Sequence, residues 1–177
     1  MTPKMCDQLS VGLFIRRGRE IAVIFRKNYP QAYALPAGHL DGKSFYNAAI
    51  KEAREEVGIA IEEQILVHEG SFQNPCGRST GTGFHSWRVY EPLAWQGTLC
   101  AGSDAAKAIW MNISELREKA HMTRAVACQL NIYPEDLAHS TPLIVNHPWW
   151  KKYPGLEPVW YIILNRMGLL FAPLPPP

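Results

Sequence analysis

The sequence predicts an α/β or α+β fold built around a mixed β-sheet, and three observations favour it. Segments rich in β-branched and aromatic residues stand before and after one Ala-rich segment with a helical signature. Further helical segments come only late in the chain, so strands surround a single main helix. The chain has 177 residues and no apparent internal repeat, which leaves room for one domain with a core and little room for a second.

The first expected elements are two strands. Residues 11–17 (VGLFIRR) and 20–27 (EIAVIFRK) have the composition of strands, and the sequence RGRE between them can turn a hairpin. A loop rich in proline and glycine is expected next, at residues 32–44. Its two glycines and one proline between Pro36 and Gly42 indicate backbone in a special geometry or in close approach to another group.

The main helix is expected over residues 44–57. Ser44 can cap its N-terminus, and the interior is rich in alanine without glycine or proline. Gly58 stands where a glycine commonly ends a helix. The sequence therefore predicts both ends of this helix.

After the main helix, three strands are expected, followed by further helices. The strands are expected at residues 64–72, 83–95 and 107–111, with a turn-rich connection at residues 73–82. A helix capped by Asn112 or Ser114 is expected at residues 112–120, with helical structure again at 123–130. Residues 156–170 indicate a terminal helix that packs on the core, with Pro158 in its first turn.

Composition and charge exclude several classes of partner. Apolar residues make up 47% of the chain and charged residues 19%, as in ordinary globular proteins. The net charge of +2 and the scattered Lys and Arg residues indicate no nucleic-acid partner. The longest apolar run, residues 158–164, is too short to span a bilayer, and the first ten residues lack the apolar segment of a secretion signal. We therefore expect a cytoplasmic protein without a membrane partner.

Four cysteines lie far apart in the sequence, at positions 6, 76, 100 and 128. None forms a Cys-x-x-Cys pair, and none has a histidine at the usual ligand spacing. The interpretation that this favours is reduced cytosolic thiols. A disulfide framework or a structural zinc site is the less favoured alternative.

Three carboxylates share one face of the main helix. At 100° per residue, Glu52, Glu55 and Glu56 fall within an arc of about 100°. Carboxylate oxygens that converge from one helix suit a hard divalent cation such as Mg²⁺. A solvated surface helix is the alternative, since Lys51 can pair with Glu55 four residues later. The helix alone leaves both interpretations open.

Residues 38–59, GHLDGKSFYNAAIKEAREEVGI, resemble the Nudix box. That motif is a glycine, five residues, a glutamate, seven residues, and then Arg-Glu-aliphatic-x-Glu-Glu-x-Gly-aliphatic. Its second half lies on residues 51–59, with Lys51 in place of arginine and Ala53 in place of a larger aliphatic residue. In the first half, Lys43 takes the position of the glutamate and the loop after Gly38 is one residue short.

The resemblance implies an α/β/α sandwich with a mixed sheet, in which the box forms a loop, a helix and a loop. Members of the family typically hydrolyse nucleoside diphosphates linked to another moiety, with Mg²⁺ or Mn²⁺ as cofactor. On that basis Glu52, Glu55 and Glu56 are expected to bind the metal. The backbone carbonyl of Gly38, or of Ala37 before it, and the carboxylate of Asp104 are expected to contribute as well. Glu55 or Glu52 would accept the proton of the attacking water, and the sequence does not choose between them.

Candidates for substrate binding lie outside the three glutamates. Arg26 can contact a phosphate, His39 neighbours the metal loop, and Phe84 and Trp87 can stack a base. For each residue a structural role is the alternative: a surface arginine, a histidine that bonds the loop, or core aromatics. A small nucleotide is the expected partner, and a homodimer is a further possibility.

The fold implied by the resemblance predicts a single Nudix hydrolase domain over residues 1–177. Its core is expected at about 9–118, a helical C-terminal extension at about 119–171 and a flexible tail at 172–177. The changes in the first half of the box raise an alternative, in which the domain is catalytically weak or inactive and binds a nucleotide-like ligand for regulation.

Overall fold

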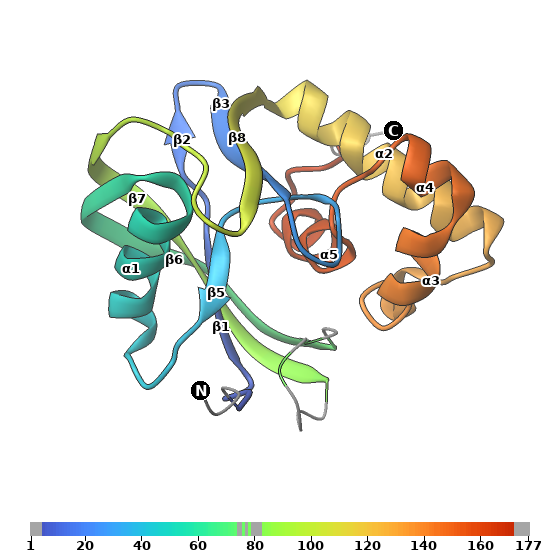
Figure 1. Ribbon diagram of the computed structural model, residues 1–177, viewed down its shortest axis with the longest axis horizontal. Coiled ribbons are helices and arrows are strands. Elements are labelled where there is room, and N and C mark those ends of the chain that lie inside the picture. The colour runs from blue at the N-terminus through green and yellow to red at the C-terminus, as the bar shows by residue number, and fades with distance from the viewer. Residues whose placement is uncertain (1–4, 74–75, 77, 79–82, 172–177) are drawn as a thin grey trace, which may run out of the picture.

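In the computed structural model, strands form the centre of the molecule, with one helix on one side and the C-terminal helices on the other (Figure 1). The structure describes residues 5–73, 76, 78 and 83–171, so the expected tail at 172–177 and most of the connection at 73–82 lie outside the described residues. The strands are β1 (Leu9–Leu13), β2 (Arg16–Arg17), β3 (Glu20–Arg26), β4 (Tyr33–Ala34), β5 (Ala37–His39), β6 (Ile59–Gln73), β7 (Phe84–Gly97) and β8 (Ala105–Asn112). The helices are α1 (Phe45–Val57), α2 (Ile113–Gln129), α3 (Thr141–Asn146), α4 (Pro148–Lys152) and α5 (Pro158–Arg166), with a 3-10 turn at Pro134–Asp136.

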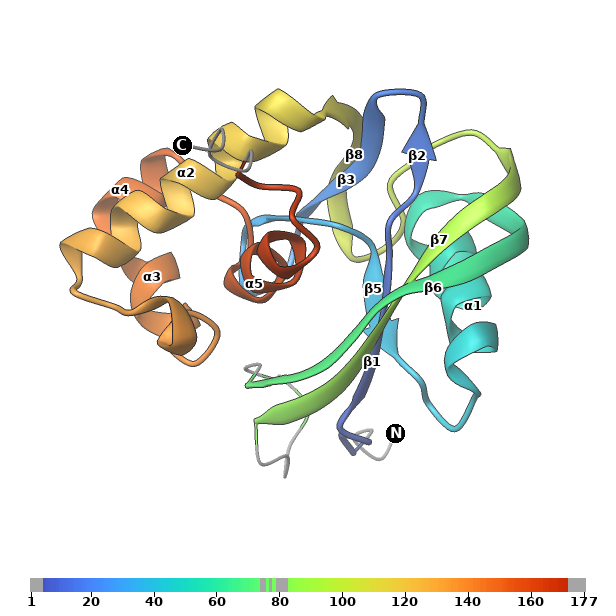
Figure 2. The ribbon, with the colours of Figure 1, turned by 180° about the vertical axis from the view of Figure 1, so that it is seen from behind.

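The strands form two sheets, one of mixed direction and one antiparallel. One sheet has the order β5-β1-β7-β6, and in the other β3 pairs with β2, β4 and β8. Strand β1 lies between an antiparallel β5 and a parallel β7. The predicted α/β fold with a mixed sheet is thereby confirmed, and Figure 2 shows the same layers from behind.

Helix α1 has the ends that the sequence predicts. The Ser44 hydroxyl accepts a hydrogen bond from the Asn47 N–H at 3.2 Å, and Gly58 ends the helix in the left-handed conformation with φ of 71°. The helix buries its alanines and Val57 against the strands. This packing directs Glu52 and Glu56 toward the loop at Gly38, because both residues lie beside the buried stripe.

Gly38 lies so close to helix α1 that a larger residue there would have to displace the Glu52 side chain. A Cβ atom on Gly38 would meet the Glu52 Cδ atom at 2.2 Å. The close approach expected from the glycines of residues 36–42 is thus an approach of strand β5 to a glutamate of the main helix.

The C-terminal helices pack against the strands through aromatic side chains. Trp160 of α5 is fully buried, meets the Trp87 ring edge-on at 5.7 Å between centroids, and lies over Gly12. Pro158 occupies the first turn of α5, as predicted. This packing brings Glu157, directly before α5, to the interior between the helix and the sheets.

Helix α2 begins with a capping box, in which the Asn112 side chain accepts from the Glu115 N–H and the Glu115 carboxylate accepts from the Asn112 N–H. Asn112 rather than Ser114 is therefore the cap. The helical segments expected at 112–120 and 123–130 form one continuous helix.

Within the described part of the chain, no helix is long and apolar enough to cross a membrane. The division into core and extension stays a prediction.

Candidate active site

A cavity of about 630 Å³ opens beside helix α1, strand β5 and the start of helix α5. Eight of the nine site residues predicted from the sequence line it: Arg26, Gly38, His39, Glu52, Glu55, Glu56, Trp87 and Asp104. Phe84 is not among the described residues that line the cavity, and its side chain is largely exposed at the first position of β7. The fold thus gathers residues from five separate segments around one space.

Glu56 is held at the inner end of the carboxylate face. Its Oε2 atom accepts a hydrogen bond from the Ala37 N–H at 2.8 Å, which joins helix α1 to strand β5. The pKa of Glu56 is raised to about 8, chiefly by burial and further by the negative charges of Glu52 and Asp104. Burial thus favours the protonated form of this carboxyl group in the metal-free fold.

Lys51 bridges the other two glutamates of the face. Its Nζ atom lies 2.8 Å from Glu52 Oε1 and 2.8 Å from Glu55 Oε2. Burial raises the pKa of Glu52, whereas the hydrogen bond from Lys51 lowers it. The Glu55 side chain is 60% exposed and the Glu52 side chain 11% exposed. The lysine that replaces the arginine of the box thus contacts both neighbouring carboxylates.

The wall opposite helix α1 carries Arg26, with Asp104 nearby. One Arg26 Nη1 atom lies 3.6 Å from the buried carboxylate of Glu157. The Asp104 backbone carbonyl accepts from the Lys27 N–H at 2.9 Å, which fixes the loop before β8 beside the end of β3. This pairing places an acidic side chain from a distant segment at the cavity, as the sequence predicted.

Two residues that line the cavity each carry a buried donor atom with no hydrogen-bond partner among the described residues. The two atoms are the Arg26 Nε atom and the Trp87 indole Nε1 atom. Buried donors in folded proteins are almost always satisfied, so such a pair indicates a ligand or water that supplies the acceptors. Oxygen acceptors, as in a phosphate group, match both donors.

The imidazole of His39 is turned toward cysteines. Its Nε2 atom lies 3.4 Å from Cys76 Sγ and 3.7 Å from Cys6 Sγ. Burial, with the positive charges of Arg78 and His85, lowers the pKa of His39 to about 4. His39 is therefore neutral near pH 7, and its Nε2 atom faces sulfur.

The donor set at the glutamates fits a divalent cation of the Mg²⁺ or Mn²⁺ type. Carboxylate oxygens of Glu52, Glu55, Glu56 and Asp104, with a backbone carbonyl in the Gly38 loop, are the hard ligands that these ions prefer. A cation there would also offset the charge that raises the pKa of Glu56.

Several residues at the cavity were not among the predicted site residues: Ser10, Asp41, Cys76, Arg78, His85 and Glu157. Arg78 binds the carboxylate of Asp41 through both of its terminal nitrogens. Glu157 carried a local signal, since it directly precedes Pro158 at a helix start. Ser10, Asp41 and His85 lie in segments that are 31 or more residues apart in the sequence, and only the sheet brings them together. Cys76 and Arg78 lie in the turn-rich connection.

Comparison with protein families places most of the chain in one domain type. The NUDIX domain model matches residues 7–130, which include strands β1 to β8 and helices α1 and α2. No curated protein matches the sequence.

Solved structures of low sequence identity share the fold. The MutT NUDIX hydrolase of Burkholderia pseudomallei is 21% identical with a TM-score of 0.53, over 79% of this chain and 96% of that chain. A bifunctional NMN adenylyltransferase/ADP ribose pyrophosphatase of Francisella tularensis is 21% identical with a TM-score of 0.50, over 66% of this chain and 37% of that chain. The NUDIX domain of NrtR from Shewanella oneidensis, complexed with ADP ribose, is 14% identical with a TM-score of 0.50, over 65% of this chain and 77% of that chain.

Proposed function

Because the chain belongs to the Nudix family of hydrolases, we propose that it cleaves a pyrophosphate bond in a nucleoside diphosphate linked to another moiety, with Mg²⁺ or Mn²⁺. The linked moiety can be a sugar, a ribose, a second nucleotide or a further phosphate. The observation that carries the proposal is the convergence of Glu52, Glu55 and Glu56 on the cavity that Arg26 also lines. Negative ligands for a cation and a positive partner for phosphate then face one space.

The glutamates would hold the cation, with help from the Gly38 loop and Asp104. When bound, such a cation neutralises phosphate oxygens and lowers the pKa of water. Glu52 and Glu56 suit the role of ligands, since burial and packing against β5 fix their side chains. Lys51 orients Glu52 and Glu55 through its two short contacts.

Glu55 is the stronger candidate for the group that accepts the proton of the attacking water. Its side chain is 60% exposed, so it can exchange that proton with solvent after each turnover. Glu52 is more buried and is pressed against Gly38, which suits a fixed ligand. The proton transfer is therefore assigned to Glu55, with Glu52 as the alternative.

Arg26 and Trp87 are proposed to contact the substrate. The Arg26 guanidinium would bind phosphate oxygens through its terminal nitrogens, and Trp87, which is 4% exposed, would contact the substrate only with the edge that lines the cavity. Phe84, outside the cavity lining, is a weaker candidate for base stacking. A cytoplasmic location and a homodimer stay predictions.

The test is hydrolysis of a panel of substrates with Mg²⁺ or Mn²⁺: ADP-ribose, nucleotide sugars, dinucleotides and nucleoside triphosphates. The wild-type chain should release phosphate-containing products from at least one class, and only with the metal. Glu55→Gln and Glu56→Gln should remove that turnover. Glu118→Gln, an equal loss of charge at an exposed position of α2, should leave it unchanged. Turnover that survives both Glu55→Gln and Glu56→Gln would contradict the mechanism.

The alternative function is a Nudix-fold module that binds a nucleotide-like ligand without cleaving it. The departures at Lys43 and Lys51 favour it, and the NUDIX domain of NrtR complexed with ADP ribose is an example of binding by this fold. Calorimetric binding of ADP-ribose or another panel member, with the ligand recovered intact after prolonged incubation with Mg²⁺ and Mn²⁺, would favour the alternative.

A further inference from the structure

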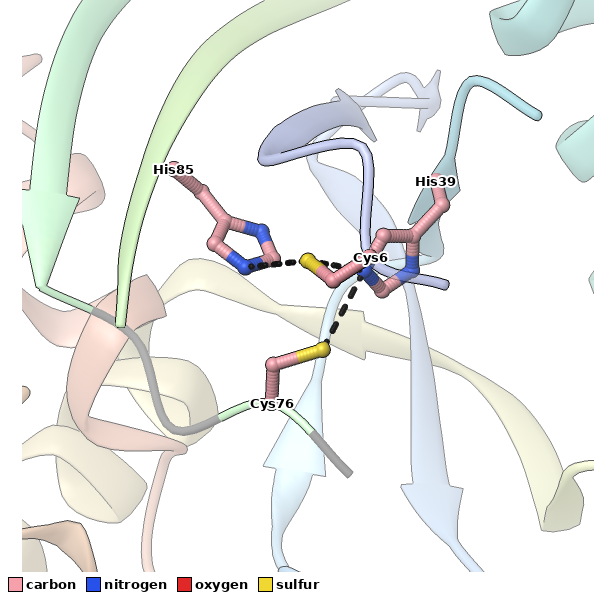
Figure 3. A group of neighbouring side chains, drawn as sticks. All are labelled: Cys6, His39, Cys76 and His85. Atoms are coloured by element: carbon pink, nitrogen blue, oxygen red, sulfur yellow. Dashed lines mark hydrogen bonds between the residues drawn. The ribbon is translucent and has the colours of Figure 1, made fainter. Parts of the chain in front are cut away.

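Two thiols and two imidazoles meet at one end of the sheet β5-β1-β7-β6 (Figure 3). Three of them, His39, Cys76 and His85, also line the cavity that the carboxylates face. Cys6 precedes β1, His39 ends β5, Cys76 lies in the connection between β6 and β7, and His85 is the second residue of β7. Each offers one ligand atom, and the four atoms all lie within 4.8 Å of one another. The four side chains therefore surround one small space.

Three of the six distances between the ligand atoms match a tetrahedral metal site, and all six are within 4.8 Å. At about 2.3 Å to sulfur and 2.0 Å to nitrogen, neighbouring ligand atoms around zinc lie roughly 3.3–3.8 Å apart. Cys6 Sγ lies 3.3 Å from His85 Nε2 and 3.7 Å from His39 Nε2, and Cys76 Sγ lies 3.4 Å from His39 Nε2. A metal at the centre would need only small shifts of the four side chains.

The sheet itself holds the two histidines in place. Strand β1 pairs with both neighbours, with Ser10 opposite His39 on β5 and Leu9 opposite Ser86 on β7. His39 and His85 therefore enter the space from strands whose register is fixed by β1. Cys6 lies three residues before β1 on the same chain segment, so regular strand pairing holds two of the four positions and the cysteines lie in the segments next to the strands.

Further hydrogen bonds orient the ligand atoms. The Ser10 hydroxyl lies 2.8 Å from His85 Nδ1, which leaves Nε2 to face the sulfur of Cys6. Each sulfur also accepts a backbone N–H two residues later, Gln8 N to Cys6 Sγ and Arg78 N to Cys76 Sγ, both at 3.3 Å. Such contacts stabilise a thiolate and set the orientation of a ligating imidazole.

We propose that Cys6, His39, Cys76 and His85 bind one zinc ion in a structural site that is separate from the carboxylate site. Two thiolates and two imidazoles in tetrahedral array select zinc over Mg²⁺ or Mn²⁺, which prefer oxygen ligands. Four protein ligands close the coordination shell, which is the arrangement of structural rather than catalytic zinc.

The position of this zinc site gives it a role in the shape of the cavity. It joins the connection that carries Cys76 and Arg78 to the end of β5, one residue from Gly38. Arg78 in turn binds Asp41 in the loop before α1. The zinc ion would thus fix two loops on either side of the nucleotide cavity relative to each other.

The experiment is metal analysis of the full chain, expressed with zinc in the medium and purified under reducing conditions. The wild-type protein should contain about one zinc ion per chain, and an excess of Mg²⁺ should not displace it. After zinc is removed, one equivalent of Co²⁺ should give the visible absorption of tetrahedral cobalt and the near-ultraviolet band of thiolate ligation. These wild-type measurements do not depend on any variant folding.

Matched variants assign the ligands. Cys6→Ser with Cys76→Ser should lower the zinc content to less than about a tenth of the wild-type value. Cys100→Ser with Cys128→Ser changes the same number of thiols at exposed positions and should keep the full zinc content. Glu52→Gln with Glu56→Gln should also keep it, which separates this site from the proposed catalytic one.

Three results would overturn the proposal. They are a wild-type chain without zinc and without a thiolate–cobalt band, iron in place of zinc, and stoichiometric zinc in the Cys6→Ser, Cys76→Ser protein. A Cys6–Cys76 disulfide in the protein purified under reducing conditions would also overturn it. Failure of substrate hydrolysis with zinc bound would instead count against the proposed function alone.

Discussion

Two clusters of ligating side chains lie side by side in this molecule, and they differ in how they are built. The carboxylates Glu52, Glu55 and Glu56 come from one helix, whereas the thiols and imidazoles of the proposed zinc site come from four segments. The first cluster consists of hard oxygen ligands at an open cavity, and the second of sulfur and nitrogen ligands that enclose a small space. The proposed catalytic ligands and the proposed zinc ligands thus differ in chemistry and in the segments that carry them, although residues of both clusters line one cavity.

The largest expected effect is at the carboxylate cluster. Glu55→Gln should lower kcat by roughly 10²–10⁴-fold, because the amide cannot accept the proton of the attacking water. The measurement is steady-state hydrolysis of the best substrate of the panel, with Glu118→Gln as the matched control. A loss confined to KM would show that Glu55 contributes to binding rather than to proton transfer.

The next effect is on stability and belongs to the thiol–imidazole cluster. Cys6→Ser with Cys76→Ser should lower the free energy of unfolding by on the order of 4 kcal/mol, as expected for loss of a structural metal. Denaturant unfolding at fixed zinc concentration measures it. The exposed pair Cys100→Ser with Cys128→Ser should stay within about 0.5 kcal/mol of wild type. Equal losses for both pairs would remove the distinction between the two sets of cysteines.

Gly38 lies between the two clusters and tests how closely they are joined. Gly38→Ala would press a Cβ atom to 2.2 Å from Glu52 Cδ, so it should displace Glu52 and weaken Mn²⁺ binding by roughly 10–100-fold. Titration of Mn²⁺ followed by electron paramagnetic resonance measures the affinity. In a protein that already carries Glu52→Gln, the additional loss should be much smaller. Additive losses would mean that Gly38 acts through another residue.

The smallest effect is a pH dependence of the metal-free protein. The folded-state pKa of Glu56 is raised to about 8, above the ordinary value of 4.5, so between these pH values the folded state binds the extra proton. The protonated Glu56 therefore stabilises the folded state. This stabilisation is fully present below pH 4.5 and is lost as the pH rises through about 8. Its contribution to the slope is at most about 1.4 kcal/mol per pH unit.

Glu56→Gln should remove that part of the slope. The free energy of unfolding of both proteins is measured from pH 5 to 9, with a chelator of divalent cations that spares bound zinc. The difference between the two curves isolates the contribution of Glu56. Saturating Mg²⁺ should flatten the slope in the wild-type chain over this range, since the carboxylate is then ionised in the folded and in the unfolded state. A wild-type curve parallel to that of Glu56→Gln would mean that Glu56 is ionised in the metal-free fold.

The contrast between the clusters also explains which features the sequence could predict. Helix α1 was predictable because its caps, Ser44 and Gly58, and its carboxylate face follow from spacing within one segment. The meeting of Cys6 with Cys76 and His85 was not, since it depends on the parallel pairing of β1 with β7, which no local pattern records. Glu157 illustrates an intermediate case: its helix was predicted, but its burial beside Arg26 depends on how α5 packs.

The resemblance to the Nudix family predicted a part of the site that residue spacing within one helix could not predict. Asp104 lies 48 residues after Glu56, and only a family pattern related the two before the structure placed both at one cavity. Phe84 is a predicted site residue that does not line the cavity. A strand position alone did not tell which aromatic residue faces the cavity, and Trp87 rather than Phe84 lines it.

The most direct test of the account is Mn²⁺ and zinc binding measured on the same three proteins. They are the wild-type chain, Glu52→Gln with Glu56→Gln, and Cys6→Ser with Cys76→Ser. We expect the glutamine variant to lose Mn²⁺ and keep zinc. We expect the serine variant to lose zinc and still bind Mn²⁺. Loss of both metals in either variant, or Mn²⁺ binding that survives loss of both glutamates, would contradict two separate sites with hard and soft ligands.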